Sequence, residues 1–361
     1  MNVLFLVPYP TEGASNRVRI EQYLPYLTEQ GIAWTLRPFV DSAFYRILYQ
    51  RGHAGAKLTR FGLSCLRRLS DLVRLRRYDL IVVHREAFPI GPPWMEGAVH
   101  WLDLPMVFDF DDSIFLSATS EPNTYVERFK RPGKVATIIG WSQEVIAGNT
   151  FLAHFAMQFN PRVTVIPSVI DTEAYRPLER PSERDEVVIG WIGSHSTRTF
   201  VAALEPVFQA LAERYRHVRF ELVGTEHPIT EVEHLTARAW QLERELTDVQ
   251  GFDIGVMPMP DDLWSQGKCG FKAILYQACG LPVVCSPVGV NREIVLDGVS
   301  GFLADSKEEW VEKLSRLIED ADLRRSLGEK GRQRVESQYS VAVHRERFVE
   351  VLRRAATRGQ A

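Results

Sequence analysis

The sequence predicts an α/β protein made of two Rossmann-like domains. The chain has 361 residues, more than one hydrophobic core usually holds. Short β-rich runs alternate with helical stretches, and the alternation restarts after a charged, proline-containing stretch at residues 171–186. Hydrophobic residues make up 45% of the chain and charged residues 25%, which excludes a disordered chain.

The N-terminal domain is expected to span residues 1–168, with a linker after it at residues 169–186. Its alternating runs are typical of βαβ units around a parallel sheet. The expected strands are residues 3–7, 33–38, 79–84, 106–110, 137–139 and 163–166, with a helix at residues 17–30.

The C-terminal domain is expected at residues 187–340 and repeats the same pattern, before a closing helix at residues 341–361. Open parallel sheets bind ligands at the carboxyl ends of their strands, so two tandem domains predict a cleft between two such edges. The expected strands are residues 187–192, 219–223, 254–257, 282–285 and 301–303, with helices at residues 200–214 and 270–278.

The cysteines and the N-terminus predict a cytoplasmic protein. Four cysteines show neither regular pairing nor the spacing of metal ligands, which favours a reducing compartment without a zinc site. The first residues, MNVLFLVPYP, have no basic start and their apolar run ends at Pro8, so a buried strand is expected there and not a signal peptide. No apolar run approaches the roughly 20 residues that span a bilayer.

Positive charge is concentrated in one segment, residues 42–78. Residues 1–168 hold 18 Lys and Arg against 15 Asp and Glu, and nine of those bases lie in the segment with one acid, Asp71. Apolar residues alternate with the bases at helical spacing, which is typical of contact with an anionic membrane surface. An ordinary domain helix, with leucines in the core and arginines in solvent, explains the pattern equally well. Nucleic acid is disfavoured, because the rest of the chain is acidic and offers no aromatic stacking platform.

Three carboxylates, Asp109, Asp111 and Asp112, lie at the end of the fourth expected strand and directly after it, in the sequence VFDFDD. Asp109 and Asp111 resemble the start of haloacid-dehalogenase-type phosphatases, where Asp109 would be the nucleophile and Asp111 the acid/base around Mg²⁺. They also resemble the D-x-D of metal-dependent glycosyltransferases. A third interpretation is a helix start capped by Asp112 or Ser113.

Two loops between a strand and a helix have the small residues that a phosphate group needs for close approach. The first contains Gly13, and the second, GWIGSHSTR, contains Gly193, Ser194 and Arg198. Backbone N–H groups at such positions, together with an arginine, favour a diphosphate. Neither loop has the full G-x-G-x-x-G pattern, so neither loop alone identifies a nucleotide site.

The stretch from residue 252 onward has the most specific pattern: FDIGVMP, ACGLPVV at 278–284, Gly289, Glu293 and GVSGFL at 298–303, in this order. It resembles the retaining family 4 glycosyltransferases, also called glycosyl transferases group 1, which have the GT-B fold. The resemblance implies transfer of a sugar from a nucleotide-diphosphate sugar with retention of configuration, without a metal cofactor. It also implies that the closing helix returns to the N-terminal domain.

The resemblance also implies roles for individual residues. Catalytic roles fall to Asp111, Arg198 and Lys272, the last two stabilising the leaving diphosphate. Donor contacts are expected from Gly13, Gly193, Ser194, Lys268, Gly289 and Glu293, and acceptor-side contacts from His84 and Asp109. The family's pair of glutamates should fall at Gly267 and Leu275, where this sequence has no acid.

The expected acceptor is a saccharide or a lipid-linked saccharide, because the basic segment lies in the domain that should receive the acceptor. Synthesis of a cell-surface polysaccharide or glycolipid is the expected setting, on the cytoplasmic face of the membrane. Three alternatives remain: the phosphatase, a non-catalytic nucleotide-sugar-binding protein, which the absent glutamates favour, and a hydrolysing nucleotide-sugar epimerase.

Overall fold

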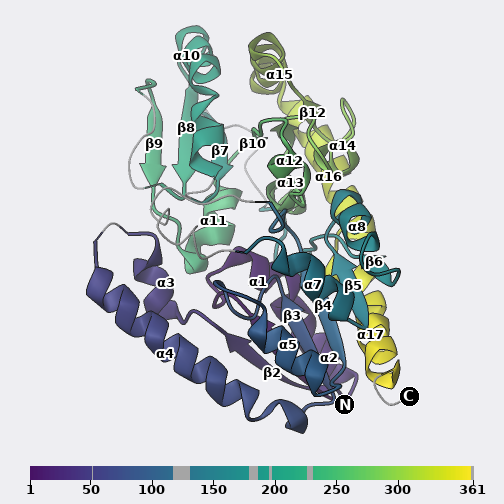
Figure 1. Ribbon diagram of the computed structural model, residues 1–361. Coiled ribbons are helices and arrows are strands. Elements are labelled where there is room, and N and C mark those ends of the chain that lie inside the picture. The colour runs from purple at the N-terminus through teal and green to yellow at the C-terminus, as the bar shows by residue number, and fades with distance from the viewer. Residues whose placement is uncertain (51, 117–130, 179–185, 195–196, 226–230, 359–361) are drawn as a thin grey trace. The chain divides into compact units, whose positions relative to one another are not determined.

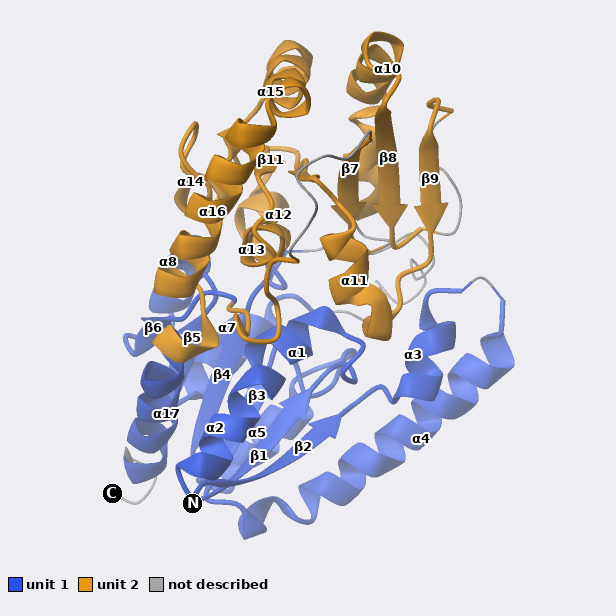
Figure 2. Cartoon of the chain, turned by 180° about the vertical axis from the view of Figure 1, so that it is seen from behind, with its two compact units in different colours: residues 1–168, 344–361 blue, residues 169–343 orange. Residues whose placement is uncertain are grey.

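A computed structural model describes the chain except for residues 51, 117–130, 179–185, 195–196, 226–230 and 359–361. The chain divides into two compact units (Figure 2): unit 1 consists of Met1–Ser168 and His344–Ala361, and unit 2 of Val169–Val343. Each unit contains one six-stranded parallel sheet with helices packed on it (Figure 1). The predicted fold class, an α/β chain of two Rossmann-like domains, is confirmed.

The sheet of unit 1 has the strand order β2-β1-β3-β4-β5-β6. Strands β3 and β4 are buried along their whole length, which explains why they read as continuous hydrophobic runs and not as alternating ones. The strands are β1 (Asn2–Val7), β2 (Ala33–Pro38), β3 (Leu80–His84), β4 (Met106–Phe110), β5 (Glu144–Ala147) and β6 (Val163–Val165). The helices are α1 (Ala14–Arg19), η1 (Glu21–Tyr23), α2 (Leu24–Glu29), α3 (Ser42–Leu48), α4 (Ala54–Leu72), η2 (Leu75–Arg77), α5 (Trp94–Trp101), α7 (Lys134–Trp141) and α8 (Thr150–Met157).

Two expectations for unit 1 were wrong. Residues 137–139 were expected to form a strand but lie in α7, where Val135, Ile138 and Ile139 are buried. A short apolar run does not distinguish a strand from a buried helix face, and the strand that follows is β5. The single helix expected at residues 17–30 is divided into α1, η1 and α2, with a proline in the first turn of α2.

The sheet of unit 2 has the strand order β12-β11-β10-β7-β8-β9. The strands are β7 (Val187–Ile192), β8 (Val218–Val223), β9 (Leu235–Arg238), β10 (Ile254–Met257), β11 (Val283–Cys285) and β12 (Phe302–Leu303). The helices are α9 (Arg198–Ala202), α10 (Glu205–Arg214), η5 (Leu242–Arg244), α11 (Glu245–Gln250), α12 (Leu263–Gln266), α13 (Phe271–Ala278), α14 (Asn291–Ile294), α15 (Lys307–Glu319) and α16 (Ala321–Gln338). The sequence pattern did not predict the edge strand β9, whose residues are only partly buried.

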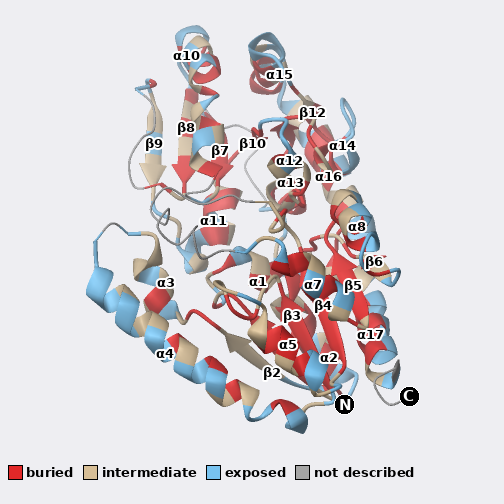
Figure 3. Cartoon of the chain, viewed as in Figure 1, coloured by how far each residue is buried: buried red, intermediate tan, exposed pale blue. Residues whose placement is uncertain are grey.

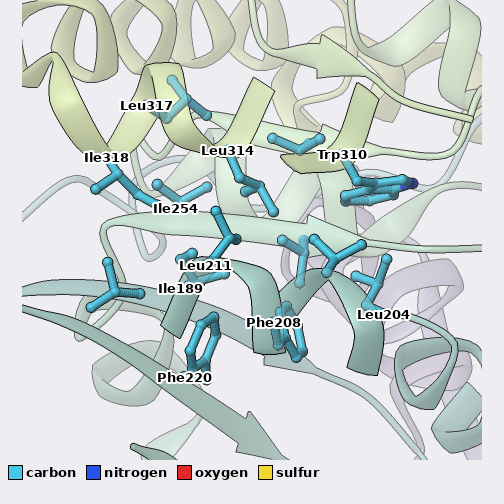
Figure 4. Packing of buried hydrophobic residues seen from close by; sticks show 14 of the residues in the cluster. Ile189, Leu204, Phe208, Leu211, Phe220, Ile254, Trp310, Leu314, Leu317 and Ile318 are labelled. Carbon is cyan, nitrogen blue, oxygen red and sulfur yellow. The ribbon is translucent and has the colours of Figure 1, made fainter. Parts of the chain in front are cut away.

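The core of unit 2 holds its strands and helices in place. Figure 4 shows side chains from α10, α15 and the strands packed together, among them Phe208, Leu211, Phe220 and Leu314. A second cluster, made by α13, the strands and the elements beside them, includes Tyr276. Because close-packed interiors tolerate little displacement, these clusters fix where each strand ends.

The last helix, α17 (Val341–Arg358), packs on unit 1, as the resemblance implied. The Phe348 ring stacks on Tyr23 with 4.3 Å between ring centroids, and Arg354 Nη2 lies 3.1 Å from Glu144 Oε2. At the start of the expected linker, the Ile170 N–H donates to the Tyr339 carbonyl. Val169 and the residues after it belong to unit 2.

In the described part of the chain, no helix has the length and apolar character that crossing a membrane requires.

Candidate functional site

The switch point of unit 1 lies between β1 and β3, where the strand order reverses. Ligands of open α/β sheets bind at the carboxyl ends of the strands beside such a point. His84 ends β3, and its register partner in β4 is Asp109. The sheet therefore places these two predicted acceptor-side residues next to each other, although they are 25 residues apart in the sequence.

Asp109 is fully buried and paired twice. Arg19 Nη2 lies 2.5 Å from Asp109 Oδ1, and His84 Nδ1 lies 2.6 Å from Asp109 Oδ2. Burial raises the pKa of Asp109, but the Arg19 guanidinium and the hydrogen bond to His84 lower it more, so the net pKa is below its ordinary value. An ionised carboxylate only accepts hydrogen bonds, so His84 Nδ1 carries the hydrogen of this bond.

The other ring nitrogen of His84 faces groups that follow β1 and β4. His84 Nε2 lies 3.3 Å from the Ser15 hydroxyl and 3.9 Å from Asp111 Oδ1. Because Asp109 fixes the proton on Nδ1, a neutral His84 presents Nε2 as a hydrogen-bond acceptor. The ring is thus oriented to receive a proton or a hydroxyl hydrogen on that side.

Asp111 is held by Arg85, a residue the sequence interpretation did not single out. Arg85 Nε donates to Asp111 Oδ1 at 2.6 Å. Burial raises the pKa of Asp111, and the Arg85 guanidinium together with His84 brings the net pKa well below the ordinary value. Arg85 has a left-handed backbone with φ of 59°, a conformation that costs a non-glycine residue energy and is often found at functional sites.

The phosphatase interpretation does not fit this geometry. A nucleophilic carboxylate must reach the phosphorus atom with a free oxygen. The Asp109 side chain is completely buried, and each of its two oxygens accepts a hydrogen bond from Arg19 or His84. Asp109 is therefore placed to orient His84 and not to attack a substrate.

The backbone of Gly13 is already used within its own loop. Its N–H donates to the Pro10 carbonyl at 2.8 Å, and a Cβ at this position would lie 2.4 Å from the Cβ of Tyr9. Glycine is thus required by a tight turn against Tyr9. The expected donor contact through this N–H would require that turn to open.

The switch point of unit 2 lies between β7 and β10. Gly193 follows β7, and Gly224 follows the neighbouring strand β8. A Cβ on Gly224, which has φ of 113°, would lie only 1.9 Å from the Gly193 carbonyl oxygen, and a Cβ on Gly193 would lie 2.2 Å from the Trp191 ring. The two glycines bring backbone against backbone at the end of the sheet.

The predicted phosphate loop after β7 leads directly into α9. Ser194 is exposed, and its carbonyl accepts a hydrogen bond from the Thr197 hydroxyl at 3.2 Å. Arg198 is the first residue of α9 and is half-buried. The two residues between Ser194 and Thr197 lie outside the described part of the chain.

Helix α13 is joined to the end of β7 by one hydrogen bond. The Tyr276 hydroxyl accepts it from the Ile192 N–H at 2.9 Å, and Tyr276 is fully buried. The helix begins after Gly270, whose φ is 65°, and Lys272 lies in its first turn. Lys268 precedes this turn, with Nζ 5.5 Å from the centre of the Trp264 ring. Two lysines thus flank the start of the helix that supports the β7 loop.

Gly289 and Glu293 lie beside the same elements. A Cβ on Gly289, which has φ of 52°, would approach the Gln266 backbone to 3.1 Å, and a Cβ on Gly270 would meet Ile294 of α14 at 2.2 Å. Glu293, on the short helix α14, is exposed, so its carboxylate is accessible. The structure therefore brings together the segments that carry Lys268, Lys272, Gly289 and Glu293.

The positions of the two absent glutamates are occupied by structural residues. Leu275 is 2% exposed and belongs to the core around α13, and Gly267 is buried at the end of α12. In this conformation, neither position offers a polar side chain to a ligand. Among the described residues, no group of three or more His, Cys, Asp or Glu side chains is arranged to hold a metal ion.

Sequence reasoning missed three residues of the unit 1 site. Arg85 and Ser15 were not named, and nothing in the sequence linked Arg19 to Asp109, against which its guanidinium is buried. The sequence did contain one sign that such partners exist, because His84 and Asp109 both lie at the ends of apolar strands. Such a pair of polar groups at a buried strand end requires compensating partners.

Comparison of whole structures defines the class of protein: the chain has the GT-B fold. Anabaena HepE in complex with UDP and glucose matches with a TM-score of 0.68 and 17% identity, covering 98% of this chain and 99% of that chain. Sucrose-phosphate synthase from Thermosynechococcus elongatus matches with a TM-score of 0.67 and 15% identity, covering 99% of both chains. A glycosyltransferase from Rickettsia africae matches with a TM-score of 0.67 and 13% identity, covering 98% of both chains.

Within this class, residues 186–320 match the family "Glycosyl transferases group 1". A D-inositol 3-phosphate glycosyltransferase from Segniliparus rotundus is 25% identical over 274 residues, which are 66% of this chain and 60% of that protein. The capsular polysaccharide biosynthesis glycosyltransferase CapM from Staphylococcus aureus is 26% identical over 166 residues, 43% of each chain. The matched regions thus span about half of these relatives, and the family match lies in unit 2.

Proposed function

We propose that this protein transfers a sugar from a nucleotide-diphosphate sugar to a saccharide or lipid-linked acceptor, with retention of anomeric configuration. One observation carries the proposal. The family match at residues 186–320 includes both the glycines that follow β7 and β8 and the lysines at the start of α13. Cell-surface polysaccharide or glycolipid synthesis on the cytoplasmic face of the membrane is the proposed setting, with residues 42–78 toward anionic lipid and no metal cofactor.

The donor diphosphate is proposed to bind unit 2. Gly193 and Gly224 bring the ends of β7 and β8 together, but their N–H groups already donate to the Val223 and Arg238 carbonyls at 2.9 Å. The diphosphate is therefore proposed to meet the exposed Ser194 that follows Gly193. Lys268, Lys272 and Arg198 supply positive charge, and the N-terminal end of the eight-residue helix α13 adds its dipole. HepE has been solved with UDP and with UDP-glucose, which makes UDP sugars the first donors to test.

Sugar transfer is proposed to place the acceptor at the site of unit 1. The ionised Asp111 carboxylate, held by Arg85, would accept a hydrogen bond from the acceptor hydroxyl or stabilise positive charge at the anomeric carbon. His84, oriented by Asp109, would contact the acceptor through Nε2. Arg198 and Lys272 would stabilise the charge that develops on the leaving diphosphate.

The test of the donor site is Lys272→Ala. Loss of a positive group that acts on the leaving diphosphate is expected to lower kcat/KM about 100-fold or more. The measurement is release of nucleoside diphosphate from a panel of nucleotide sugars, with product configuration read by NMR. Lys330→Ala, which removes an exposed lysine of α16 in the same unit, is the matched control and should leave the rate unchanged. Equal rates for both variants would remove Lys272 from the mechanism.

A second candidate is a nucleotide-sugar-binding protein without catalysis. Leu275 and Gly267 favour it, because no acid stands at the two positions where the resembled family grips the donor. A thermal shift by a nucleotide sugar, with no transfer to any acceptor and no hydrolysis, would support this candidate. A ligand at 100 times its Kd stabilises the folded state by about 2.7 kcal/mol, which such a screen detects.

A further inference from the structure

Helix α4 turns large apolar side chains toward solvent. A helix that packs on a domain normally buries its apolar stripe, but in α4 and the residue after it Leu58 is 73% exposed, Leu66 63%, Leu69 47% and Val73 86%. Figure 3 shows exposed residues along most of this helix. The interpretation of residues 42–78 as a helix with its leucines in the core is therefore wrong for α4.

The inner side of α4 is attached to unit 1 by a group of buried polar residues and by Phe61, whose ring centroid lies 5.6 Å from that of Phe39. Ser64, Arg68 and Asp71 are buried. Asp71 lies 2.7 Å from an Arg37 nitrogen and 3.4 Å from Arg68 Nη1, and Arg68 also donates to the carbonyl of Val7 at 3.4 Å. These contacts attach α4 to strands β1 and β2 without using the exposed leucines.

The four exposed apolar residues share one face. With 100° of rotation for each residue, positions 58, 66, 69 and 73 fall within an arc of about 80°. We call Leu58, Leu66, Leu69 and Val73 together the α4 apolar face. Leu63, which is 47% exposed, lies beside it. The arc extends over four turns, with the exposed Gly62 between Leu58 and Leu66, unlike the scattered apolar residues that occur on most protein surfaces.

Positive charge lies next to the α4 apolar face, and no exposed acid of the segment offsets it. Asp71 is the one acid in residues 42–78, and it is buried. Arg60 and Arg67 are paired with Asp41, outside the segment, at 3.6 and 2.6 Å. Arg74, Arg76 and Arg77, which follow the end of α4, are exposed and join no ion pair within the described residues.

We infer that the α4 apolar face inserts into the interface of an anionic lipid bilayer, with Arg74, Arg76 and Arg77 at the headgroups. The charge pattern favours a bilayer over a second copy of the chain, because two copies meeting at this face would bring arginines together without a partner acid from the segment. An anionic bilayer supplies both apolar depth and negative charge. The inference rests on the proposed function in one respect: a lipid-linked acceptor would be presented by this surface.

The test is binding of the full chain to sedimenting vesicles of phosphatidylcholine with about one third phosphatidylglycerol. Leu66→Ala/Leu69→Ala removes six carbon atoms from the inserting face, and the partition coefficient is expected to fall on the order of a hundredfold. Leu178→Ala/Leu296→Ala, which truncates two exposed leucines of unit 2 equally, is the matched control and should bind like the unchanged chain. Neither double variant should lower the melting temperature, since all four side chains are exposed.

A second variant separates insertion from electrostatic attraction. Arg74→Gln/Arg76→Gln/Arg77→Gln is expected to reduce binding to the anionic vesicles toward the level on phosphatidylcholine alone. The inference is overturned if the unchanged chain does not sediment with vesicles, or if only the arginine variant loses binding. It is also overturned if the leucine variant converts a dimer of the unchanged chain to a monomer, since the face would then join two copies.

Failure of this inference and failure of the proposed function have different readouts. Vesicle binding is measured without donor or acceptor, so a chain that binds lipid but releases no nucleoside diphosphate contradicts the transferase alone. A chain that hydrolyses or transfers the donor sugar but does not bind vesicles contradicts the membrane face alone. The Leu66→Ala/Leu69→Ala variant should keep the rate of donor hydrolysis in solution, because neither residue is in the donor site.

Discussion

At the scale of single residues, the site proposed for the acceptor is a set of buried and partly buried charges that neutralise one another. Arg19 pairs with Asp109, Arg85 pairs with Asp111, and His84 lies between the two carboxylates. Such pairs contribute little to stability when complete, but removal of one partner leaves an uncompensated charge in the interior. What these pairs do is orient the two carboxylates, because each pair fixes one carboxylate in position and keeps it ionised.

Removal of Asp109 should therefore destabilise unit 1 strongly. Asp109→Ala leaves Arg19 buried without its partner, and the free energy of unfolding is expected to fall by about 3–5 kcal/mol. Urea unfolding followed by circular dichroism measures this. Asp322→Asn, which weakens the exposed pair with Arg325, is the control and should have little effect. A small effect of Asp109→Ala would mean that Arg19 finds another partner.

The lowered pKa values also predict a dependence on pH. For Asp109 and Asp111 the pKa in the folded state lies below the unfolded value of about 3.9, so their stabilisation is present above that pH. It should be lost as the pH falls below about 4 toward the folded pKa. Unfolding measured from pH 7 to pH 3 is expected to show this decline, and Asp111→Asn should flatten it. An unchanged acid profile in Asp111→Asn would contradict the pairing with Arg85.

At the scale of elements, the edge of unit 2 at which we propose donor binding depends on two strands that are each followed by a glycine. Gly193 and Gly224 follow β7 and β8 and lie in direct backbone contact. Helix α13 supports this edge through the hydrogen bond between Tyr276 and Ile192. The position of this edge thus depends on the packing of β7, β8 and α13 in addition to the sequence of the loop itself.

Gly224→Ala tests this contact. The new methyl group would overlap the Gly193 carbonyl, and the positive φ adds strain, so a loss of about 2–4 kcal/mol in unfolding free energy is expected. The thermal shift by nucleotide sugars should disappear with it. Gly298→Ala is the control: its φ of 72° is also positive, but no atom lies within 4 Å of the new Cβ. If both variants lose the same stability, backbone strain alone is responsible and the close approach has no role.

At the scale of the whole molecule, the two ends of the chain are joined in unit 1. Residues from His344 onward pack with the first 168 residues, so unit 1 is completed only when the last helix returns. Unit 2 is continuous in sequence from Val169 to Val343. Damage to α17 should accordingly affect unit 1 and spare unit 2.

Phe348→Ala measures this dependence. Phe348 is 1% exposed and stacked on Tyr23, and its truncation is expected to cost about 3–5 kcal/mol. Hydrogen exchange read by mass spectrometry should become faster in β1 and β3 but stay unchanged in β7 and β8. Val343→Ala, an exposed residue of the same helix, is the control. Faster exchange in both units would mean that they unfold together.

The sequence predicted most strands because their apolar runs are short and separated by helical stretches. It failed at residues 137–139, where a short apolar run forms part of α7, and at β9, where partial burial leaves no clear pattern. It located His84, Asp109 and Asp111 but not Arg85 or Ser15. No local pattern links Arg19 to Asp109, since the two are 90 residues apart and meet only when the sheet forms.

By itself, the sequence determined the α/β alternation, the division into two domains and the resemblance to a glycosyltransferase family, which is most specific from residue 252 onward. These properties are encoded by neighbouring residues, through periodicity and the order of motifs. The tertiary structure alone decided that Asp109 is a buried partner of Arg19 and that the leucines of α4 face outward. Periodicity shows that a helix has an apolar side, but which side meets the protein depends on the partners that the rest of the chain brings to it.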